Sequence, residues 1–454
     1  GLNRVLKVER QDADALGGNP QAFRETYRAT YNNFGQLTSE TNTDWEGAKD
    51  IALTSTFEYD AWGEQYTVTG ADGVVRITAN DPPTQTLLSW SQSLETPPKI
   101  TGKTRSILNR FGKEDKVEAL DAEDRLVSEV QFLYDGLGNC VEQIDPMGES
   151  TRFDFDLFGR VQSTTLPDYT EIQRAYASHS EAELPVSLEV IANGNTTCMG
   201  LQTFDGLDRR TTLKVGPRLQ QFQYKDGQLQ VDTQITASHQ SISYEYQLGL
   251  TGTPVASIAP DEQSSFNYDP RSARLSLSEN IQRQHSFEYS STGRLRCESW
   301  TEKRSGKRWE TCHTHTLDGR PLSRMNNEGL PCTYSYDEKA RLKTATQGQI
   351  RATFGYDSLS QINLITTFNA HTQQELQTRL TFDDQGREIL RQINLSGGHP
   401  QQTITQVYRA DSKLHSRHLQ KGDETELLET FDYDPRGRLV QYNCEGTQLP
   451  KDRY

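Results

Sequence analysis

The sequence predicts an all-β protein built as one long antiparallel sheet of hairpins. Three observations support this fold class. A short motif of an aromatic residue, Asp, turn residues and Gly recurs along the 454 residues. Apolar residues make up only 33% of the chain, yet it contains 19 Tyr and 16 Phe. Helical periodicity is poor throughout. Recurrence at a short period indicates a stack of similar units, in which each unit rests on its neighbours.

The motif is clearest between Tyr433 and Leu439. Tyr433 and Asp434 are expected to end one strand, and Arg438 and Leu439 to begin the next. The Asp side chain can accept hydrogen bonds from backbone N–H groups further along the turn. Gly437 supplies the left-handed position that a hairpin loop of this kind needs. Each copy of the motif is therefore predicted to be a β-hairpin corner.

The copies define the predicted structural corners. Tyr134 and Phe155 are 21 residues apart, a length that accommodates two strands of roughly five to six residues with their turns. Less regular copies replace the late Gly with Asp or Ala, and one copy has Ser290 in place of the Asp. The residues expected to build the corners are Tyr59, Asp60 and Gly63; Tyr134, Asp135 and Gly138; Phe155, Asp156, Gly159 and Arg160; Phe204 and Asp205; Tyr268 and Asp269; Tyr336 and Asp337; Tyr356 and Asp357; Phe382, Asp383 and Gly386; Tyr433, Asp434 and Gly437.

Taken in order, the chain reads as one repeat segment over residues 1–454. Gly17 to Pro20 predicts a turn before the first clear strand, and residues 55–78 read as hairpins around the first regular corner. Residues 79–104 contain two Pro-Pro pairs, so we expect an insertion or a long crossing there. Residues 117–216 form the clearest block of hairpins, and the pattern continues to the end of the chain.

Composition limits the possible functions. A polar chain rich in strands and aromatic residues favours a thin curved wall that is wet on both faces, and its aromatic content argues against disorder. The net charge of -15 argues against nucleic acid as a partner, because phosphate binding needs a basic surface. No run of 18 apolar residues occurs, so no membrane-spanning helix is expected. The six Cys are scattered, and we expect free thiols.

Candidate catalytic and metal-binding residues have simpler interpretations. The repeated Asp residues are better explained as turn caps than as a catalytic pair. The segment from Asp145 to Gly148 has ordinary Pro-Gly turn chemistry. Cys312, His313 and His315 form the only Cys/His cluster, but their spacing fits no standard zinc site. Nucleotide-binding and hydrolase signatures are missing. We therefore expect no catalytic residues, no metal and no cofactor.

The corners from Tyr134 to Arg160 and from Phe431 to Leu439 resemble those of RHS/YD-repeat proteins. Within that family the chain is most similar to the B component, with the adjoining C component, of bacterial insecticidal toxin complexes (Tc toxins). The resemblance implies that the antiparallel sheet winds into a spiral that is part of a hollow shell. It also implies that the shell encloses a toxic effector polypeptide. The self-cleaving core domain of that family has no counterpart here.

The resemblance implies partners and a location. The partners would be the remaining B/C chain, its enclosed effector and, through missing parts, a pore-forming A component; the complex would be secreted. Because Gly1 stands in place of an initiator Met and the sequence stops in mid-pattern, we expect a fragment of a longer chain, without a signal peptide. The alternative function is a secreted or cell-surface repeat module that binds carbohydrate or a receptor through exposed aromatic residues. A hydrolase with an unrecognised site is the third hypothesis.

Overall fold

The computed structural model describes residues 4–11, 23–46, 49–247, 249, 252–327 and 329–446. The turn predicted at Gly17 to Pro20 lies outside these ranges. Within them, no residue is helical and no helix could cross a membrane. The first strands are β1 (Lys7–Arg10), β2 (Arg24–Tyr31), β3 (Leu37–Glu46), β4 (Lys49–Tyr59), β5 (Gln65–Thr69), β6 (Val75–Asp81), β7 (Thr86–Gln92), β8 (Ile100–Leu108), β9 (Glu114–Leu120), β10 (Leu126–Tyr134), β11 (Cys140–Ile144), β12 (Ser150–Phe155) and β13 (Val161–Thr165).

The middle and last strands continue in the same way. The middle strands are β14 (Glu171–Tyr176), β15 (Pro185–Ala192), β16 (Asn195–Phe204), β17 (Arg210–Val215), β18 (Arg218–Gln223), β19 (Thr233–Ile235), β20 (Ser241–Tyr246), β21 (Pro254–Ile258), β22 (Gln263–Tyr268), β23 (Leu275–Glu279), β24 (Arg283–Tyr289) and β25 (Leu295–Glu302). The last strands are β26 (Arg308–His315), β27 (Pro321–Asn326), β28 (Cys332–Tyr336), β29 (Leu342–Gln347), β30 (Ile350–Tyr356), β31 (Ile362–Asn369), β32 (Gln374–Phe382), β33 (Glu388–Leu395), β34 (Gln402–Tyr408), β35 (Leu414–Lys421), β36 (Glu424–Tyr433) and β37 (Leu439–Gly446).

All 37 strands belong to one sheet, and each strand pairs antiparallel with the next along the chain, as at β1–β2, β19–β20 and β36–β37. The predicted fold class is confirmed. Each predicted corner follows a shift in register at its aromatic residue, for example at Tyr134, Phe382 and Tyr433. Such bulges bend a strand and increase its twist. The repeated bulges therefore help the sheet to curve.

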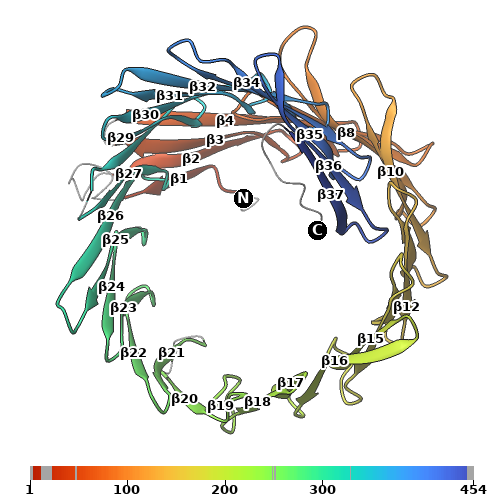
Figure 1. The fold of residues 1–454 in the computed structure, drawn as a ribbon, viewed down its shortest axis with the longest axis vertical. Helices are drawn as coiled ribbons and strands as arrows, with labels where there is room; N and C mark the ends of the chain where they lie inside the picture. The colour runs from red at the N-terminus through yellow and green to blue at the C-terminus, as the bar shows by residue number, and fades with distance from the viewer. Residues whose placement is uncertain are drawn as a thin grey trace.

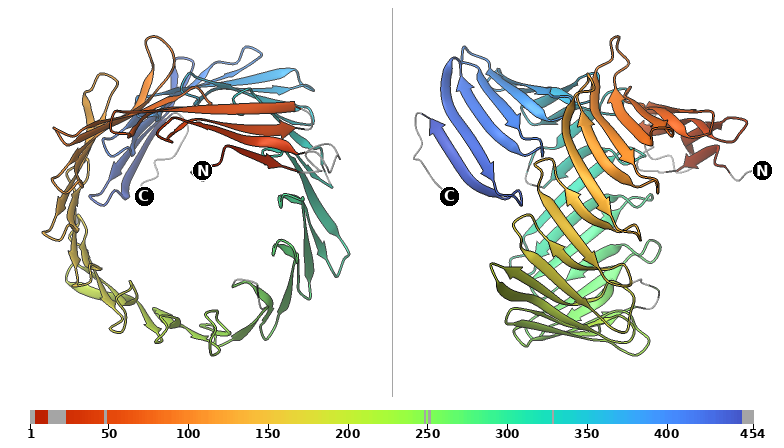
Figure 2. Two further views of the ribbon diagram at one scale, coloured as in Figure 1. Left: turned by 180° about the vertical axis from the view of Figure 1, so that it is seen from behind. Right: turned by 90° about the vertical axis from the view of Figure 1, so that its right-hand side faces the viewer.

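The sheet winds into an open ring and then overlaps itself. Figure 1 shows the wall curving around an empty centre, and the first strands and the last strands of the chain overlap at the top of the view. Seen from the side, the sheet is a spiral strip, and the N-terminal and C-terminal ends lie on opposite sides of it (Figure 2). We call β1–β26 the first turn of the spiral and the segment from Thr316 onward the second turn.

The strip has two different edges. Because neighbouring strands are antiparallel, successive hairpin turns alternate between the edges. We call the edge with the turns after even-numbered strands the corner edge, since every predicted corner lies there. The opposite edge carries the turns after odd-numbered strands, and we call it the plain edge. The period of about two strands in the sequence thus becomes a row of equivalent corners along one edge.

The wall has little apolar core. Ala29, Phe222 and Ala256 are among its few buried apolar residues outside the overlap. Leu120 and Leu317 are the largest fully buried apolar residues of the described chain, and both lie in the overlap of the two turns. A single-layer sheet can bury little apolar surface, which agrees with the low apolar content of the sequence.

Two expectations can be compared with this structure. Residues 79–104 contain β7 and the start of β8, which pair in sequence order with their neighbours. The prediction of free thiols is wrong for Cys297 and Cys312, which form a disulfide. These residues lie directly opposite each other on β25 and β26, so strand register brings their sulfur atoms together. Cys140, Cys198, Cys332 and Cys444 are free.

Candidate functional site

Each corner is a closed turn built around one Asp. At the corner of Asp383, the backbone N–H of Asp383 donates to the carbonyl of Arg387 at 2.9 Å, and Gly386 N–H donates to the Asp383 carbonyl. The Oδ1 of Asp383 accepts from the N–H groups of Gln385 and Arg387 at 3.0 and 2.9 Å. Gly386 has a φ of +77°. The carboxylate thus caps the turn.

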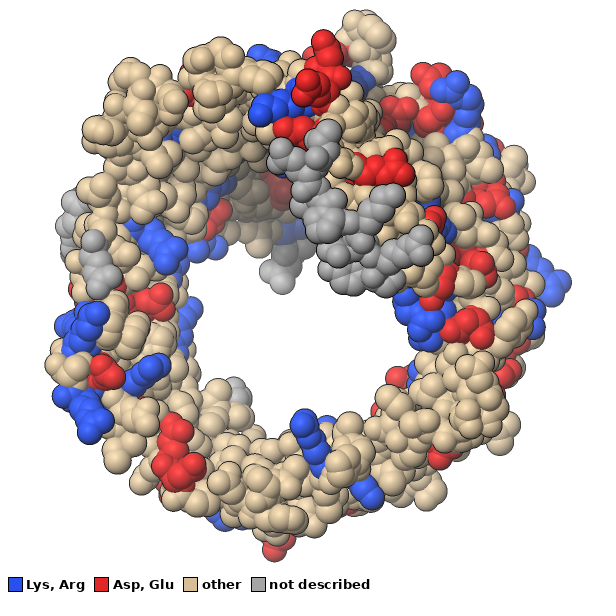
Figure 3. All heavy atoms as spheres, viewed as in Figure 1, with Lys and Arg blue, Asp and Glu red and all other residues tan. Residues whose placement is uncertain are grey.

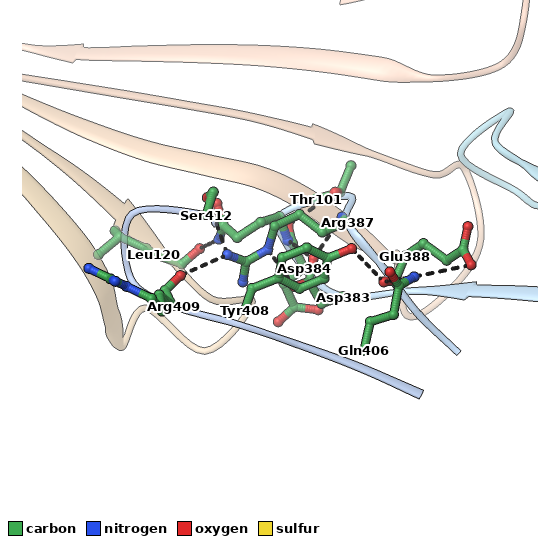
Figure 4. A network of polar contacts seen from close by, with 11 residues as sticks. Thr101, Leu120, Asp383, Asp384, Arg387, Glu388, Gln406, Tyr408, Arg409 and Ser412 are labelled. Atoms are coloured by element: carbon green, nitrogen blue, oxygen red, sulfur yellow. Dashed lines mark hydrogen bonds and ion pairs between the residues drawn. The ribbon is translucent and has the colours of Figure 1, made fainter. Parts of the chain in front are cut away.

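Arginine and tyrosine link each corner to the next (Figure 4). Arg387 donates from Nε to Oδ2 of Asp383 at 2.8 Å and from Nη1 to Ser412 Oγ at 3.2 Å in the following corner. Its guanidinium lies 4.9 Å from the ring centre of Tyr408. Tyr408 makes a second contact between the two corners, because its hydroxyl donates to the carbonyl of Glu388 at 2.9 Å. We call this chain of contacts the corner ladder.

The corner ladder recurs around the ring. The same set of contacts occurs at Arg341, which donates to Asp337 and to Ser360 and lies over the ring of Tyr356. The hydroxyl of Tyr356 donates in turn to the Leu342 carbonyl at 2.8 Å. The tyrosines whose hydroxyls donate in this way to the preceding corner include Tyr59, Tyr134, Tyr176, Tyr224, Tyr246, Tyr268, Tyr289, Tyr336 and Tyr433. Arg or Lys side chains also lie over several of these rings, as at Tyr134, Tyr289 and Tyr433.

Corners without the late Gly keep the same backbone conformation. Asp208, Ala273, Ala340 and Ser360 occupy the position of the missing glycine, and their φ values lie between +54° and +62°. A residue with a side chain pays a conformational penalty there, which the surrounding hydrogen bonds of the turn offset. The geometry of the corner is thus preserved where its sequence is degenerate.

The hydrogen bonds of the corners favour the charged form of the aspartates. The Arg209 side chain is the main cause of the lowered pKa of Asp205, and the Asn139 side chain is the main cause for Asp135. At Asp337, burial raises the pKa, but hydrogen bonds from the backbone and side chain of Arg341 outweigh it and the net pKa is lowered. These carboxylates lie one to a corner around the ring, so each stabilises a separate turn.

The second turn of the spiral rests on the first turn along a seam. In the seam, the plain edge of the first turn meets the corner edge of the second turn. The plain edge contributes residues 44–46, 70–74, 93–102, 120–125 and 166–170. The corner edge contributes residues 316–320, 337–341, 357–361, 383–387 and 434–438. The polar contacts of the seam join residues more than 250 positions apart, for example 258 between Lys99 and Asp357. They include Lys99 with Asp357 at 2.7 Å and both Arg436 and Arg438 with Asp168 at 3.3 Å.

Asp44 is the most buried charge in the seam. It is 3% exposed and accepts from Asp318 N–H at 2.7 Å and from Arg320 Nη1 at 2.5 Å. Leu317 N–H donates to the carbonyl of Trp45 at 2.9 Å beside it, and the Leu317 side chain is fully buried. A small cavity of about 40 Å³ lies against Asp44, Trp45 and Arg320. An ion pair, backbone hydrogen bonds and apolar packing therefore all hold the corner at residues 316–320 against the plain edge of the first turn.

The corner of Asp383 forms another seam contact. The carbonyl of Asp384 accepts from Gly102 N–H at 2.7 Å and from Thr101 Oγ1 at 3.0 Å. The Asp384 carboxylate accepts from Ala122 N–H, and Gln385 Nε2 donates to the Leu120 carbonyl at 2.7 Å. Thr101, Leu120 and Asp384 of this contact are labelled in Figure 4. Sequence reasoning did not anticipate these contacts, since they join segments that are more than 250 residues apart.

Other candidate sites have structural explanations. Asp145 accepts from Met147 N–H and Glu149 N–H in an ordinary turn. Cys312 is in the disulfide, so its sulfur is not a metal ligand in this state, and no group of three potential metal ligands occurs among the described residues. A hollow of about 370 Å³ lies between Phe266, His285 and Trp300.

The aromatic faces near that hollow are covered. The indole rings of Trp300 and Trp309 stack at 3.8 Å. Arg283 lies 5.3 Å from the centre of the Trp300 ring, and Lys307 lies 4.4 Å from that of Trp309. A sugar ring would need one of these indole faces to be free. The arrangement therefore gives little support to a carbohydrate-binding aromatic platform.

Comparisons with known proteins agree with the repeat. Residues 157–382 match the family model described as Teneurin YD-shell, and residues 134–171 match the model described as RHS Repeat. None of the curated proteins matches the chain.

Solved structures share the fold at low sequence identity. The crystal structure of TcdB2-TccC3-Cdc42 matches with a TM-score of 0.62 and 13% identity, over 99% of this chain and 28% of that chain. The crystal structure of TcdB2-TccC3-TEV matches with a TM-score of 0.59 and 12% identity, over 98% and 28% of the two chains. A Tc holotoxin pore of Photorhabdus luminescens that includes TccC3 matches at 0.41, which adds nothing to the fold argument. This chain thus spans about a quarter of the length of the structures it matches.

Proposed function

The chain is an RHS/YD-repeat protein with a sheet similar to those of Tc toxin structures, and from this premise we propose that it forms part of the wall of a hollow container. The container encloses an effector polypeptide and helps to deliver it. The remaining B/C chain, the effector and a pore-forming component are its partners, and the complex is secreted. The role of this chain is structural rather than catalytic, and the predicted corner residues serve to shape the wall.

The seam is the observation that supports the proposal most. A curved sheet whose turns did not touch would leave a gap through which a protease could reach a passenger. Here the second turn is joined to the first by buried groups at Asp44 and Leu317 and by further contacts as far as Asp168. A wall sealed along its own length is the property that a container needs.

The corner carboxylates support a structural role. A hydrolase that uses two carboxylates needs both of them at one scissile bond. Asp135, Asp205 and Asp337 each cap a different turn. Their lowered pKa values have causes within those turns. The carbohydrate-binding alternative depends on free aromatic faces, and those of Trp300 and Trp309 are covered.

Protease protection of a passenger tests the proposal. The chain would be produced within its assembled complex together with an unfolded passenger polypeptide, and the digestion of the passenger would be followed with time. We expect slow digestion with the native wall and at least tenfold faster digestion when Asp44 and Leu317 are both replaced by Ala. A double variant at the exposed residues Met199 and Leu201 is the matched control. A passenger digested at the same rate with the native wall and with the seam variant would contradict enclosure.

A further inference from the structure

A histidine takes the place of a ladder tyrosine where the first turn of the spiral passes into the second. Among the even-numbered strands from β20 to β36, β26 alone ends in His, at His315, and the others end in Tyr or Phe. The register shifts at His315 as it does at the corner aromatic Tyr289. The imidazole therefore stands at the ladder position directly before the seam corner of residues 316–320. Unlike a tyrosine ring, it takes up a proton near neutral pH.

Arg294 is the ladder arginine that precedes His315, and it lacks the carboxylate with which such arginines pair elsewhere. Arg341 and Arg387 each donate from Nε to the Asp that caps their own corner. In the corner of Arg294 the capping residue is Ser290, and Nε of Arg294 is buried without a hydrogen-bond partner. The positive charge of Arg294 is thus not neutralised within its own corner.

The side chain of Arg294 reaches into the seam corner of residues 316–320. Its Nη2 donates to the Leu317 carbonyl at 3.3 Å, and it packs so closely over Gly319 that a Cβ atom there would collide with it. Leu317 is fully buried, and its N–H donates across the seam to the Trp45 carbonyl at 2.9 Å. A displacement of Arg294 is therefore transmitted to a contact between the two turns of the spiral.

Burial and nearby charge both favour the neutral imidazole of His315. The side chain is half-buried, and burial is the main cause of its lowered pKa. The charges of His313 and Arg294 lower the pKa of His315 further. The ring of His313 lies on the same face of β26, with 6.0 Å between the two ring centres. At neutral pH, His315 is therefore uncharged and has basic groups on two sides.

The other charged groups of the described residues around His315 add positive charge or are engaged elsewhere. Arg296 of β25 and Arg324 of β27 lie on the two neighbouring strands, and Lys49 lies on β4 across the seam. Tyr336 of β28 stays uncharged, since burial raises its pKa. The nearby acidic groups are Asp44, paired with Arg320; Asp318, 3.5 Å from Arg10; Glu298, 3.9 Å from His285; and Glu46, which is exposed. Lys and Arg also predominate on this side of the ring, at the left of Figure 3, although the net charge of the chain is -15.

We propose that His315 makes the seam corner of residues 316–320 sensitive to mild acid. Protonation of the imidazole places a second positive charge beside Arg294, and like charges in a half-buried site repel each other strongly. The repulsion displaces Arg294 from the Leu317 carbonyl, and the corner separates from the plain edge of the first turn. The other seam corners follow a Tyr or Phe in place of this His, so they stay closed under the same conditions.

The direction of the effect follows from the linkage between protonation and opening. The pKa of His315 in the closed corner is lowered from its ordinary value of 6.5. As pH falls, the opened corner therefore takes up a proton before the closed corner does. The closed corner is fully favoured above pH 6.5 and loses stability as pH falls from there through the lowered value. This inference rests on the seam, and it stands whether or not the wall encloses an effector.

Hydrogen exchange of the full chain at pH 7.5 and pH 5.5 tests the proposal. Exchange times are corrected for the intrinsic pH dependence of amide exchange. Residues 316–320 should exchange faster at pH 5.5 by about fivefold, the lower end of typical coupling between two linked equilibria. The seam corner at residues 357–361 is the internal control, since it follows Tyr356 and should keep the same corrected rate.

Variants identify the groups responsible. His315→Tyr restores the ladder residue and His315→Gln removes the titrating group, and in both the corrected rate at residues 316–320 should be the same at the two pH values. His371→Gln, in an exposed turn, should respond like the native chain. Arg294→Lys keeps the charge and should keep the response, whereas Arg294→Gln should reduce it. The ratio of the rates at the two pH values is compared, so a variant that loosens the corner at every pH remains informative.

Several results would overturn the proposal. Equal corrected rates at pH 7.5 and pH 5.5 in the native chain would show that the corner does not sense mild acid. A rise at residues 357–361 as large as that at residues 316–320 would indicate a general loosening of the wall. A full response in both His315 variants would assign the effect to another group, and a full response in Arg294→Gln would exclude repulsion from Arg294 as its cause.

Discussion

The carboxylate of Asp44 lies 2.5 Å from the guanidinium of Arg320, although 276 residues separate them in the chain. This pair lies near the start of the second turn, where that turn packs against the first turn. Its location explains why the side chain of Asp44 is buried in a wall that is otherwise thin and wet. The wall therefore has two kinds of contact, which are the local corner ladder and the seam between distant residues.

Breaking the Asp44–Arg320 pair should open the seam locally. In Asp44→Ala, Arg320 and the N–H of Asp318 lose their partner, and removing one member of a buried pair costs roughly 3 kcal/mol. Hydrogen exchange of residues 316–320 should become faster, while exchange in β12 stays unchanged. The exposed pair of Arg308 and Glu310 provides the control, because Glu310→Ala should cost less than ~1 kcal/mol. Unchanged exchange at residues 316–320 would show that the pair does not hold the seam.

Leu317 and Leu157 occupy the same position in their corners and differ only in what surrounds them. Leu317 is fully buried in the seam, whereas Leu157 is completely exposed. Leu317→Ala should destabilise the chain by roughly 2–5 kcal/mol, because it leaves a cavity. Leu157→Ala should change stability by less than ~0.5 kcal/mol. Denaturant unfolding of the two variants checks the difference, and equal losses of stability would argue against the seam.

Gly437 should not tolerate a β-branched residue. Its φ is +72°, and a Cβ atom there would collide with the side chain of Lys413 from the preceding corner. Gly437→Val should therefore lower the melting temperature, since strain of this kind costs about 1–3 kcal/mol. Gly206→Ala is the matched control, because a Cβ at that position meets nothing within 4 Å. A melting temperature unchanged by Gly437→Val would count against the assigned role of this corner.

Acid should destabilise the ring. The pKa values of Asp135 and Asp205 are lowered in the folded chain, from an ordinary value of 3.8. As pH falls, the unfolded chain therefore takes up protons before the folded chain does, and folding becomes less favourable. This contribution is complete above the ordinary pKa and is lost as pH falls below about 4 through the lowered values.

Thermal melts between pH 7 and pH 3 check this pH dependence. The melting temperature should fall on acidification, and Asp205→Asn should show a smaller fall than the native chain because it lacks one of the titrating groups. A melting temperature that rises between pH 5 and pH 3 would have the wrong sign for these carboxylates.

The cysteines provide a direct chemical check. Thiol titration of the denatured, unreduced protein should find four free thiols of the six, since Cys297 and Cys312 are joined. Cys297→Ser should release the thiol of Cys312 and raise the count to five. Six thiols in the native chain would favour the original expectation from the sequence.

The corners could be predicted from the sequence because they are local. Asp, a turn and Gly within five residues contain the hydrogen-bond donors and acceptors of the turn, as at Asp383 and Gly386. The 21-residue period also placed the corners on one edge, since it spans two strands. Degenerate corners such as that of Asp337 keep their shape because Ala340 adopts the positive φ that glycine was expected to supply.

The seam could not be predicted in the same way. Leu157 and Leu317 have similar local sequences, and their different burial depends on a plain edge more than 250 residues away. The Cys297–Cys312 disulfide was missed because it depends on the register of β25 against β26, where each cysteine faces the other. The links from each tyrosine to the preceding corner were also missed, since they depend on the curvature of the wall. These features follow from the pitch of the spiral rather than from any single repeat.

Zero-length cross-linking of Lys99 to Asp357 tests the spiral most directly. Carbodiimide couples an amine to a carboxylate only when the two are in contact, and here Nζ and Oδ2 are 2.7 Å apart across 258 residues. In the monomer fraction we expect a linked peptide pair containing Lys99 and Asp357, alongside the local pair Lys225–Asp232 as a positive control. A digest with the local link but without the Lys99–Asp357 link would contradict a wall that closes on itself.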